Sequence, residues 1–246
     1  MSAGIPVVRV TVMTHRGAVR GANEDALVVG SFTACGVSLS DPVTHEVPLS
    51  SPVVVAVADG MGGHAAGDTA SAHAVRTLAF TSPQDETAVE AALEQIDIDL
   101  LGMGRADPSV AGLGTTVAGV LLTAEGSTHF GVGDSRVYLE TGGYLAQVSV
   151  DDRGPLGGLS QCLGGRVDGT GLKTTAGPLA GADRLLLCSD GLSDLVDHDT
   201  IEELLGGPGG SARIVKSLWA AAMNASGRDN ITIALVEFRQ SAEAGS

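Results

Sequence analysis

The chain has 246 residues, of which 43% are hydrophobic and only 3% are aromatic, a composition typical of a globular domain with an aliphatic core. Its formal net charge of −15 argues against a nucleic-acid-binding surface, because phosphates are neutralised by basic faces. The three cysteines, Cys35, Cys162 and Cys188, are too few and too scattered for a disulfide framework or a zinc knuckle.

The expected location and organisation follow from the same overview. No apolar stretch approaches the ~20 residues that a membrane span needs, and the first residues lack a signal-peptide pattern. We therefore expect a soluble, cytoplasmic and monomeric protein that binds neither nucleic acid nor membrane. One folded domain over residues 1–240 is expected, followed by a disordered tail at 241–246.

Apolar segments rich in β-branched residues recur along the chain and predict strands. They are 7–13, 26–32, 52–58, 115–123, 128–133, 136–140, 184–188 and 230–238. Several of them are apolar without a break, which is typical of strands covered on both faces. Residues 33–51 and 151–183 are expected to be irregular, because they are rich in Gly, Ser, Pro and Asp.

Helical periodicity predicts three helices among these strands. The first covers 67–80. The second is expected to begin at Ser82, with Pro83 in its first turn and Asp85 completing a capping box. The third covers about 211–223. Strands and helices do not alternate as they do in a doubly wound sheet, so we expect two packed sheets covered by helices.

Acidic residues mark the ends of the predicted strands. Four apolar runs end or begin at an aspartate and a Glu-Asp pair precedes another, the residues being Asp59, Asp134, Asp190, Asp229, Glu24 and Asp25. Each one alone is explained by a turn, since Asp-Gly and Asp-Asn are common turn dipeptides. If gathered together, two carboxylates ~4 Å apart would repel by roughly 4 kcal/mol at an effective dielectric near 20. Either the strand ends point apart, or a divalent cation lies among them, and all-oxygen ligands favour Mg²⁺ or Mn²⁺ over zinc.

Three further residues stand beside these acids in the sequence. Gly60 has no side chain, so the main chain around it can approach an ion or a phosphate closely. Arg20 has the planar fork that matches phosphate oxygens, although a surface salt bridge is an equally good explanation. His64, in VADGMGGHAAGD (57–68), is placed to donate a proton near neutral pH, whereas the other five histidines are interpreted as surface or packing residues.

Six segments, in this order, resemble the motifs of the metal-dependent protein phosphatases of the PPM, or type 2C, family in its bacterial form. They are GAVRGANEDA (17–26), VADGMGGHAAGD (57–68), GLGTTVAGVLL (112–122), GVGDSRVYL (131–139), LLCSDGLSD (186–194) and GRDNITIALV (227–236). The resemblance implies an α+β fold, a four-layer αββα sandwich of two central, mostly antiparallel sheets flanked by helix pairs. It also implies hydrolysis of phosphoserine and phosphothreonine in a protein substrate, such as a serine/threonine kinase or its targets.

The resemblance also implies the cofactors and their ligands. Two Mn²⁺ or Mg²⁺ ions would be bound, with direct attack on phosphorus by a hydroxide that bridges them. Carried over by matching position, Asp59 would bridge the ions, Asp190 and Asp229 would complete the first, and the Gly60 carbonyl would bind the second, with Glu24 and Asp25 acting largely through water. Asp134, with Asp190, would form a weaker third site. Arg20 would hold the substrate phosphate, and His64 would be the general acid.

Two other functions stay open, one of them because the chain departs from the family pattern. Bacterial members carry a few dozen largely helical residues, called the flap, where this chain has only 153–165. The short flap leaves a phosphatase of a small phosphorylated metabolite as an alternative. A catalytically silent phosphoprotein-binding module is the other alternative, and loss of a metal-ligating aspartate would favour it; Asp59, Asp190 and Asp229 are all present.

Overall fold

Two antiparallel sheets form the centre of the protein, which is described by a computed structural model over residues 5–62, 66–155, 158–165 and 171–238. In spatial order, the six-stranded sheet contains β10 (Tyr144–Gln147), β9 (Arg136–Thr141), β12 (Arg184–Cys188), β13 (Ile231–Phe238), β1 (Val7–His15) and β4 (Val43–Pro48). The seven-stranded sheet contains β11 (Thr175–Leu179), β8 (Ser127–Val132), β7 (Val117–Leu122), β5 (Val53–Met61), β2 (Asp25–Val29) and β3 (Phe32–Cys35), with the short β6 (Gly114–Thr115) paired to β5.

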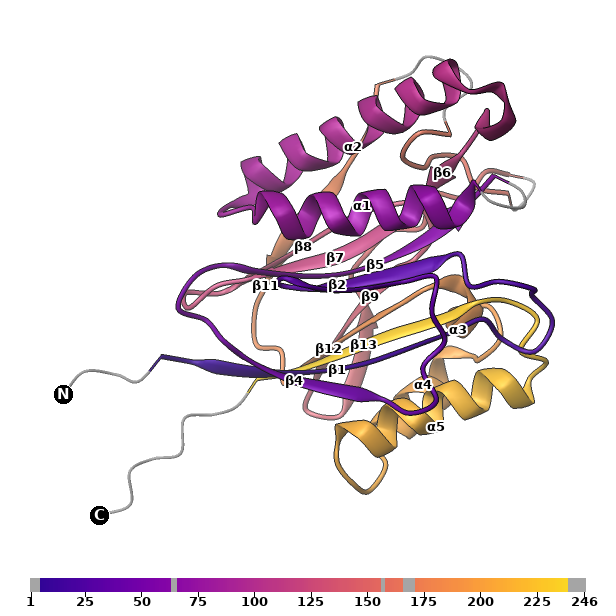
Figure 1. Ribbon diagram of the computed structural model, residues 1–246. Coiled ribbons are helices and arrows are strands. Elements are labelled where there is room, and N and C mark those ends of the chain that lie inside the picture. Colours follow the sequence, from indigo (N-terminus) through magenta and orange to yellow (C-terminus); the bar gives the residue numbers. More distant parts are fainter. Residues whose placement is uncertain (1–4, 63–65, 156–157, 166–170, 239–246) are drawn as a thin grey trace.

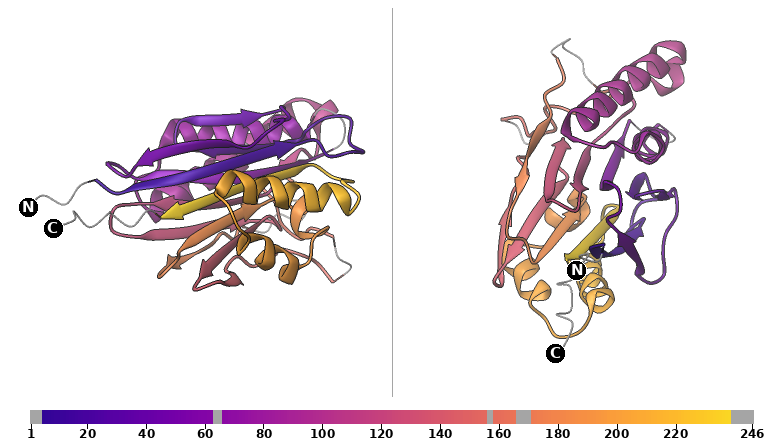
Figure 2. Two further views of the ribbon diagram at one scale, coloured as in Figure 1. Left: turned by 90° about the horizontal axis from the view of Figure 1, so that it is seen from below. Right: turned by 90° about the vertical axis from the view of Figure 1, so that its left-hand side faces the viewer.

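Helices cover the outer face of each sheet (Figure 1). The seven-stranded sheet is covered by α1 (Gly67–Thr81) and α2 (Glu86–Ala106), which is followed by a 3-10 turn at Pro108–Val110. The six-stranded sheet is covered by α3 (Asp190–Ser193), α4 (His198–Leu205) and α5 (Ser211–Asn224). The two views of Figure 2 show the helical layers on opposite sides of the paired sheets. This arrangement confirms the expected four-layer αββα sandwich.

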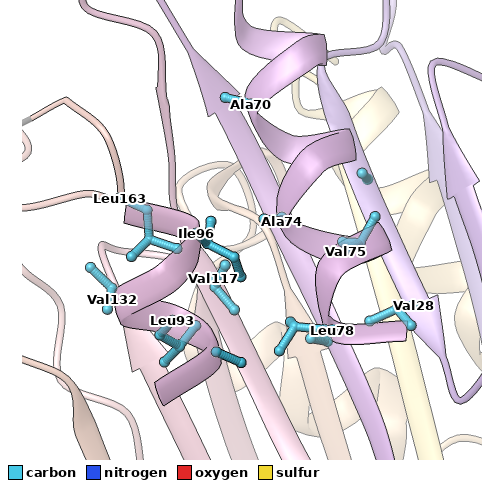
Figure 3. Packing of buried hydrophobic residues seen from close by; sticks show 14 of the residues in the cluster. Val28, Ala70, Ala74, Val75, Leu78, Leu93, Ile96, Val117, Val132 and Leu163 are labelled. Carbon is cyan, nitrogen blue, oxygen red and sulfur yellow. The ribbon is translucent and has the colours of Figure 1, made fainter. Parts of the chain in front are cut away.

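Three hydrophobic clusters hold the four layers together, one at each junction. β5 contributes to two of them, because alternate side chains of a strand point to opposite faces. Val53, Val55 and Val57 pack between the sheets, whereas Val54 and Ala56 pack under α1 and α2. Figure 3 shows the cluster under α1 and α2, whose side chains face the strands. Burial on both faces is therefore the reason that the strand sequences are apolar without a break.

The predicted first and third helices are confirmed, with α1 and α5 each ending one residue later than expected. The capping box at Ser82 is wrong. Ser82 instead ends α1 with a left-handed backbone (φ 44°), and its N–H donates to the Leu78 carbonyl at 3.1 Å. α2 is capped by Asp85, whose side chain accepts the N–H of Ala88 at 2.8 Å. No helix within the described ranges is long and apolar enough to cross a membrane.

Two expectations about the strands are corrected by the structure: one predicted strand is divided in two, and the stretches 33–51 and 151–183, expected to be irregular, contain strands. The predicted strand 26–32 is in fact split by a two-residue turn at Gly30-Ser31, so that β2 and β3 form a hairpin. After this hairpin the chain crosses to the other sheet, where β4 pairs with β1 as an exposed edge strand. β11 pairs with β8 at the edge of the seven-stranded sheet. The predicted tail at 241–246 lies outside the described residues.

Candidate metal centre

An open pocket of about 540 Å³ lies where β2, β5, β12 and β13 begin or end. Its walls include most of the predicted site residues, namely Arg20, Glu24, Asp59, Gly60, Asp134, Asp190 and Asp229. In Figure 1, α3 and the end of β5 lie at the end of the sandwich opposite the beginning of β1. Antiparallel pairing thus gathers at one end of the sandwich residues that are separated by as many as 209 positions, as Arg20 and Asp229 are.

The first two carboxylates are placed by the pairing of β2 with β5. Asp25 lies directly opposite Asp59 in the register of these strands. The main chain of Asp59 is fixed by Thr116, whose Oγ1 accepts the Asp59 N–H at 3.0 Å and whose N–H donates to the Asp59 carbonyl at 2.9 Å. Asp25 is only 1% exposed, and its Oδ2 accepts a hydrogen bond from Ser189 Oγ at 2.7 Å. The strand register therefore holds two carboxylates side by side.

The next two carboxylates come from the C-terminal third of the chain. Asp190 follows β12 and is the first residue of α3, whereas Asp229 directly precedes β13. One oxygen of Asp229 accepts a hydrogen bond from Arg20 Nη2 at 2.8 Å, and the other accepts the Asn230 N–H at 2.8 Å. Arg20 lines the pocket and its guanidinium is held there by Asp229, although 49% of its side chain is exposed.

Asn230 organises the loop that carries Arg20, a role that sequence reasoning missed. Its Oδ1 accepts the N–H of Glu24 at 2.8 Å, and its Nδ2 donates to the carbonyls of Arg16 and Ala22 at 3.0 and 2.9 Å. Asn230 is 3% exposed. The Asp-Asn dipeptide before β13 was the only signal in the sequence, and it indicates a turn as readily as a loop anchor.

The electrostatics of three of these carboxylates, Asp25, Asp59 and Asp190, are unfavourable in the protein alone. Burial is the largest cause that raises the pKa of Asp25 to about 7; hydrogen bonds with Thr232 and Ser189 lower it, and the charges of Asp190 and Asp229 raise it. Burial, followed by the charge of Asp25, raises the pKa of Asp59 well above its usual value. Burial, followed by the charge of Asp229, raises the pKa of Asp190 to about 6. Each shift means that the charged form is disfavoured where it stands, which is the condition that a bound cation reverses.

The donor atoms fit a hard divalent cation. Asp25 Oδ1 and Asp190 Oδ1 are buried and have no hydrogen-bond partner among the described residues, and such oxygens are costly unless something pairs with them. All of the candidate ligands are oxygens, which Mg²⁺ and Mn²⁺ prefer. In the part of the chain that the structure describes, no three His, Cys, Asp or Glu side chains form a ready-made ligand set for one ion. The individual ligand roles therefore stay predictions.

Gly60 is required where the main chains of β5, α1 and the Glu24 loop converge. A Cβ at Gly60 would lie 2.0 Å from the Gly67 carbonyl oxygen and 2.7 Å from that of Glu24. The Gly60 N–H donates to the Glu24 carbonyl at 3.2 Å. No side chain fits at this position, and Gly60 and Glu24 both lie at the wall of the pocket. Binding of an ion by the Gly60 carbonyl stays a prediction.

Two predicted site residues, His64 and Asp134, differ from the others in what the structure shows of them. His64 lies outside the described residues, so the structure does not place it. Asp134 is 8% exposed and lines the pocket, but its Oδ2 lies 3.0 Å from Nη2 of Arg153. Arg153 and its second partner, Asp194, are pocket residues that sequence reasoning missed, because their contacts depend on how the short segment after β10 folds.

Comparison with known proteins gives a consistent result. The family model described as protein phosphatase 2C matches residues 36–235. The serine/threonine phosphatase stp of Listeria monocytogenes is 29% identical over 91% of this chain and 93% of its own length. The serine/threonine protein phosphatase PstP of Mycobacterium tuberculosis is 29% identical over 94% of this chain and 45% of its own length.

Solved structures extend the comparison to the fold. The crystal structure of M. tuberculosis PstP has a TM-score of 0.75 and 28% identity, covering 95% of this chain and all of the solved one. The catalytic domain of PstP in complex with two manganese ions has a TM-score of 0.75 and 29% identity, covering 95% and 99% of the two chains. The chain belongs to the protein phosphatase 2C family and is a protein serine/threonine phosphatase.

Proposed function

We propose that this phosphatase binds two Mn²⁺ or Mg²⁺ ions at the pocket carboxylates and uses them to hydrolyse phosphoserine and phosphothreonine in proteins. The ligands would be Asp59, Asp190, Asp229 and the Gly60 carbonyl, with Glu24 and Asp25 acting through water. The observation that carries the proposal is the pair of buried, unpartnered carboxylate oxygens on Asp25 and Asp190. The two manganese ions in the PstP catalytic domain support the same number here.

The chain's own residues would divide the remaining work. When bound, the ions would supply Lewis acidity and a water nucleophile near neutral pH. Arg20 would bind the substrate phosphate, since its guanidinium already lines the pocket and is oriented by Asp229. The backbone of the Asp59-Gly60 segment, fixed by Thr116, would keep the carboxylates from moving as charge develops on the phosphate.

His64 is proposed as the general acid on the basis of its place in the sequence, four residues after Gly60. A serine or threonine alkoxide needs a proton as it leaves, whereas an aryl oxide is stable without one. His64→Gln should therefore slow the hydrolysis of a phosphopeptide by about 10²-fold or more and that of an aryl phosphate much less. Equal losses on both substrates would instead assign His64 a structural role.

The metal assignment is tested with Asp59→Asn, which keeps the shape of the side chain and removes its charge. Phosphate release from a phosphopeptide at saturating Mn²⁺ should fall by at least ~10²-fold, since charge at the reacting centre is the largest usual contribution to catalysis. The matched control is Asp41→Asn, because the Asp41 side chain is 80% exposed and pairs with Lys216 away from the pocket. Activity of Asp59→Asn close to that of the wild type would refute the two-metal site.

A further inference from the structure

The short segment that follows β10 is fixed against the turn that carries Asp134. The Asp152 N–H donates to the Gly133 carbonyl at 2.9 Å, and the Gly133 N–H donates to Asp152 Oδ2 at 2.8 Å. Ser160 returns to the same point, since its N–H donates to the Asp152 carbonyl at 2.8 Å. Arg153 also pairs with Leu159 across this small loop. The main chain of Arg153 is thereby held at the wall of the pocket, beside Asp134.

The side chain of Arg153 lies among carboxylates. Its Nη2 is 3.0 Å from Asp134 Oδ2 and 2.9 Å from each oxygen of Asp194, while its Nε is 4.0 Å from Asp151 Oδ2. Asp151 is already neutralised, because Arg136 donates to both of its oxygens from Nε and Nη2. The single charge of Arg153 is therefore directed at Asp134 and Asp194.

The same contacts conflict with a cation bound to Asp134. An ion on the Asp134 carboxylate would share that group with the guanidinium, and like charges so close repel strongly. The Arg153 guanidinium donates hydrogen bonds to Asp194 and pairs with Asp134. A divalent ion bound to Asp134 would have to displace it from these contacts. The carboxylate that the resemblance assigns to a weaker third metal ion is thus already paired with a positive group of the protein.

We propose that the guanidinium of Arg153 replaces the third metal ion in this phosphatase, acting as a built-in cation between Asp134 and Asp194. The inference rests on the proposed two-metal site and adds a metal stoichiometry to it: two ions per chain and no third. It also changes the role of Asp134 from a metal ligand to a residue that positions Arg153. The short flap is consistent with this role, because the segment that remains is the one that holds Arg153 in place.

The test counts Mn²⁺ by calorimetric titration of the metal-free wild type, Arg153→Met and Arg153→Lys. The wild type and Arg153→Lys should bind two ions. Arg153→Met, which removes the charge but keeps a long side chain, should bind a third ion at least about tenfold more weakly than the other two. Adding Asp134→Ala to Arg153→Met should abolish that third site. Arg9→Met is the matched control, because Arg9 is similarly exposed (33% against 30%) and pairs with Glu46 near the beginning of β1.

The possible outcomes separate the two proposals. A third ion in the wild type, or two ions in Arg153→Met, would overturn the role of Arg153 while leaving the two-metal site intact. Fewer than two ions in the wild type would overturn both. Circular dichroism and thermal unfolding of each variant check that it folds. If Arg153→Met does not fold, the number of ions bound by the wild type and by Arg153→Gln decides the role of Arg153 instead.

Discussion

At the scale of single residues, the site is built from acidic side chains whose burial and closeness to one another are unfavourable unless a cation is bound. Asp25 is 1% exposed, lies opposite another aspartate, and has one oxygen without a partner among the described residues. Neutral residues around these carboxylates hold the main chain by hydrogen bonds. Asn230 bonds to three main-chain groups, and Thr116 makes two bonds with the main chain of Asp59. A metal centre is expected to have this arrangement, in which neutral hydrogen-bonded residues hold carboxylates that lack a partner of their own.

Arg20 offers the most direct residue-scale prediction. Arg20→Ala should raise the KM for a phosphopeptide by about tenfold or more and lower kcat/KM, because the proposed charge-assisted contact with the phosphate would be present both before and during the reaction. Mn²⁺ stoichiometry should stay at two, since Arg20 is a partner of Asp229 and not a ligand. Steady-state kinetics of Arg20→Ala and of the exposed control Arg105→Ala provide the comparison. Unchanged kinetics would make Arg20 a surface charge that only pairs with Asp229.

At the scale of elements, the critical contact is the one between the end of β5 and the beginning of α1. Gly60 and Gly67 face each other so closely that a Cβ on either would lie within 3 Å of the other's main chain. α1 is in turn held on the sheet by Ala70, Ala74, Val75 and Leu78, all of which are fully buried. The helix therefore cannot shift to admit a side chain without loss of this packing.

Gly60→Ala should destabilise the protein for this reason. The new methyl group has no space at the β5–α1 contact, and overpacking of a rigid main-chain contact should lower the free energy of unfolding by on the order of 3 kcal/mol or more. Gly126→Ala is the control, because a Cβ at Gly126 meets nothing within 4 Å. Urea unfolding of both variants measures the difference. A Gly60→Ala variant as stable as the control would show that β5 and α1 separate easily.

At the scale of the whole molecule, the sandwich collects acids from distant parts of the chain at one end. The three hydrophobic clusters fix the layers. Carboxylates from the residue before β2, from β5, from α3 and from the loop before β13 line the pocket. In a chain with a net charge of −15, this convergence adds repulsion to the folded state that the unfolded chain does not have. A bound cation would favour the folded state by relieving that repulsion.

Metal removal should therefore lower thermal stability. Mn²⁺ at about 100 times its dissociation constant adds ~2.7 kcal/mol by mass action, and for a chain of this size each kcal/mol shifts Tm by about 2–4 °C. We expect Mn²⁺ to raise Tm by about 5–11 °C and EDTA to reverse the change. Asp25→Asn should be at least as stable as the wild type without metal, because it removes a buried charge, and should gain less from Mn²⁺. Scanning calorimetry with and without the ion measures both effects, and a wild-type Tm that ignores Mn²⁺ would contradict the metal centre.

The sequence by itself determined the two packed sheets and the helix that covers one of them. Apolar runs without a break at 52–58 and 115–123 predicted strands buried on both faces, and the period of 67–80 predicted the helix that covers them. These inferences succeeded because burial and side-chain periodicity are local properties of a segment. Aspartates at strand ends left two alternatives open, strand ends that point apart or acids gathered around a cation, and the structure brings Asp59, Asp134, Asp190 and Asp229 to one pocket.

Only the tertiary structure decided the features that depend on which segments meet. Ser82 and Asp85 are both good caps by type, and the path of the chain between α1 and α2 selected Asp85. β4 and β11 are too polar or too exposed to be recognised as strands from the sequence. They form because each pairs with the otherwise outermost strand of a sheet, β4 with β1 and β11 with β8. Arg153 reaches Asp134 and Asp194 through the fold of a short loop, and no spacing in the sequence specifies such a contact. Long-range pairing sets these positions, because their free energy comes from partners distant in the chain and not from the segment itself.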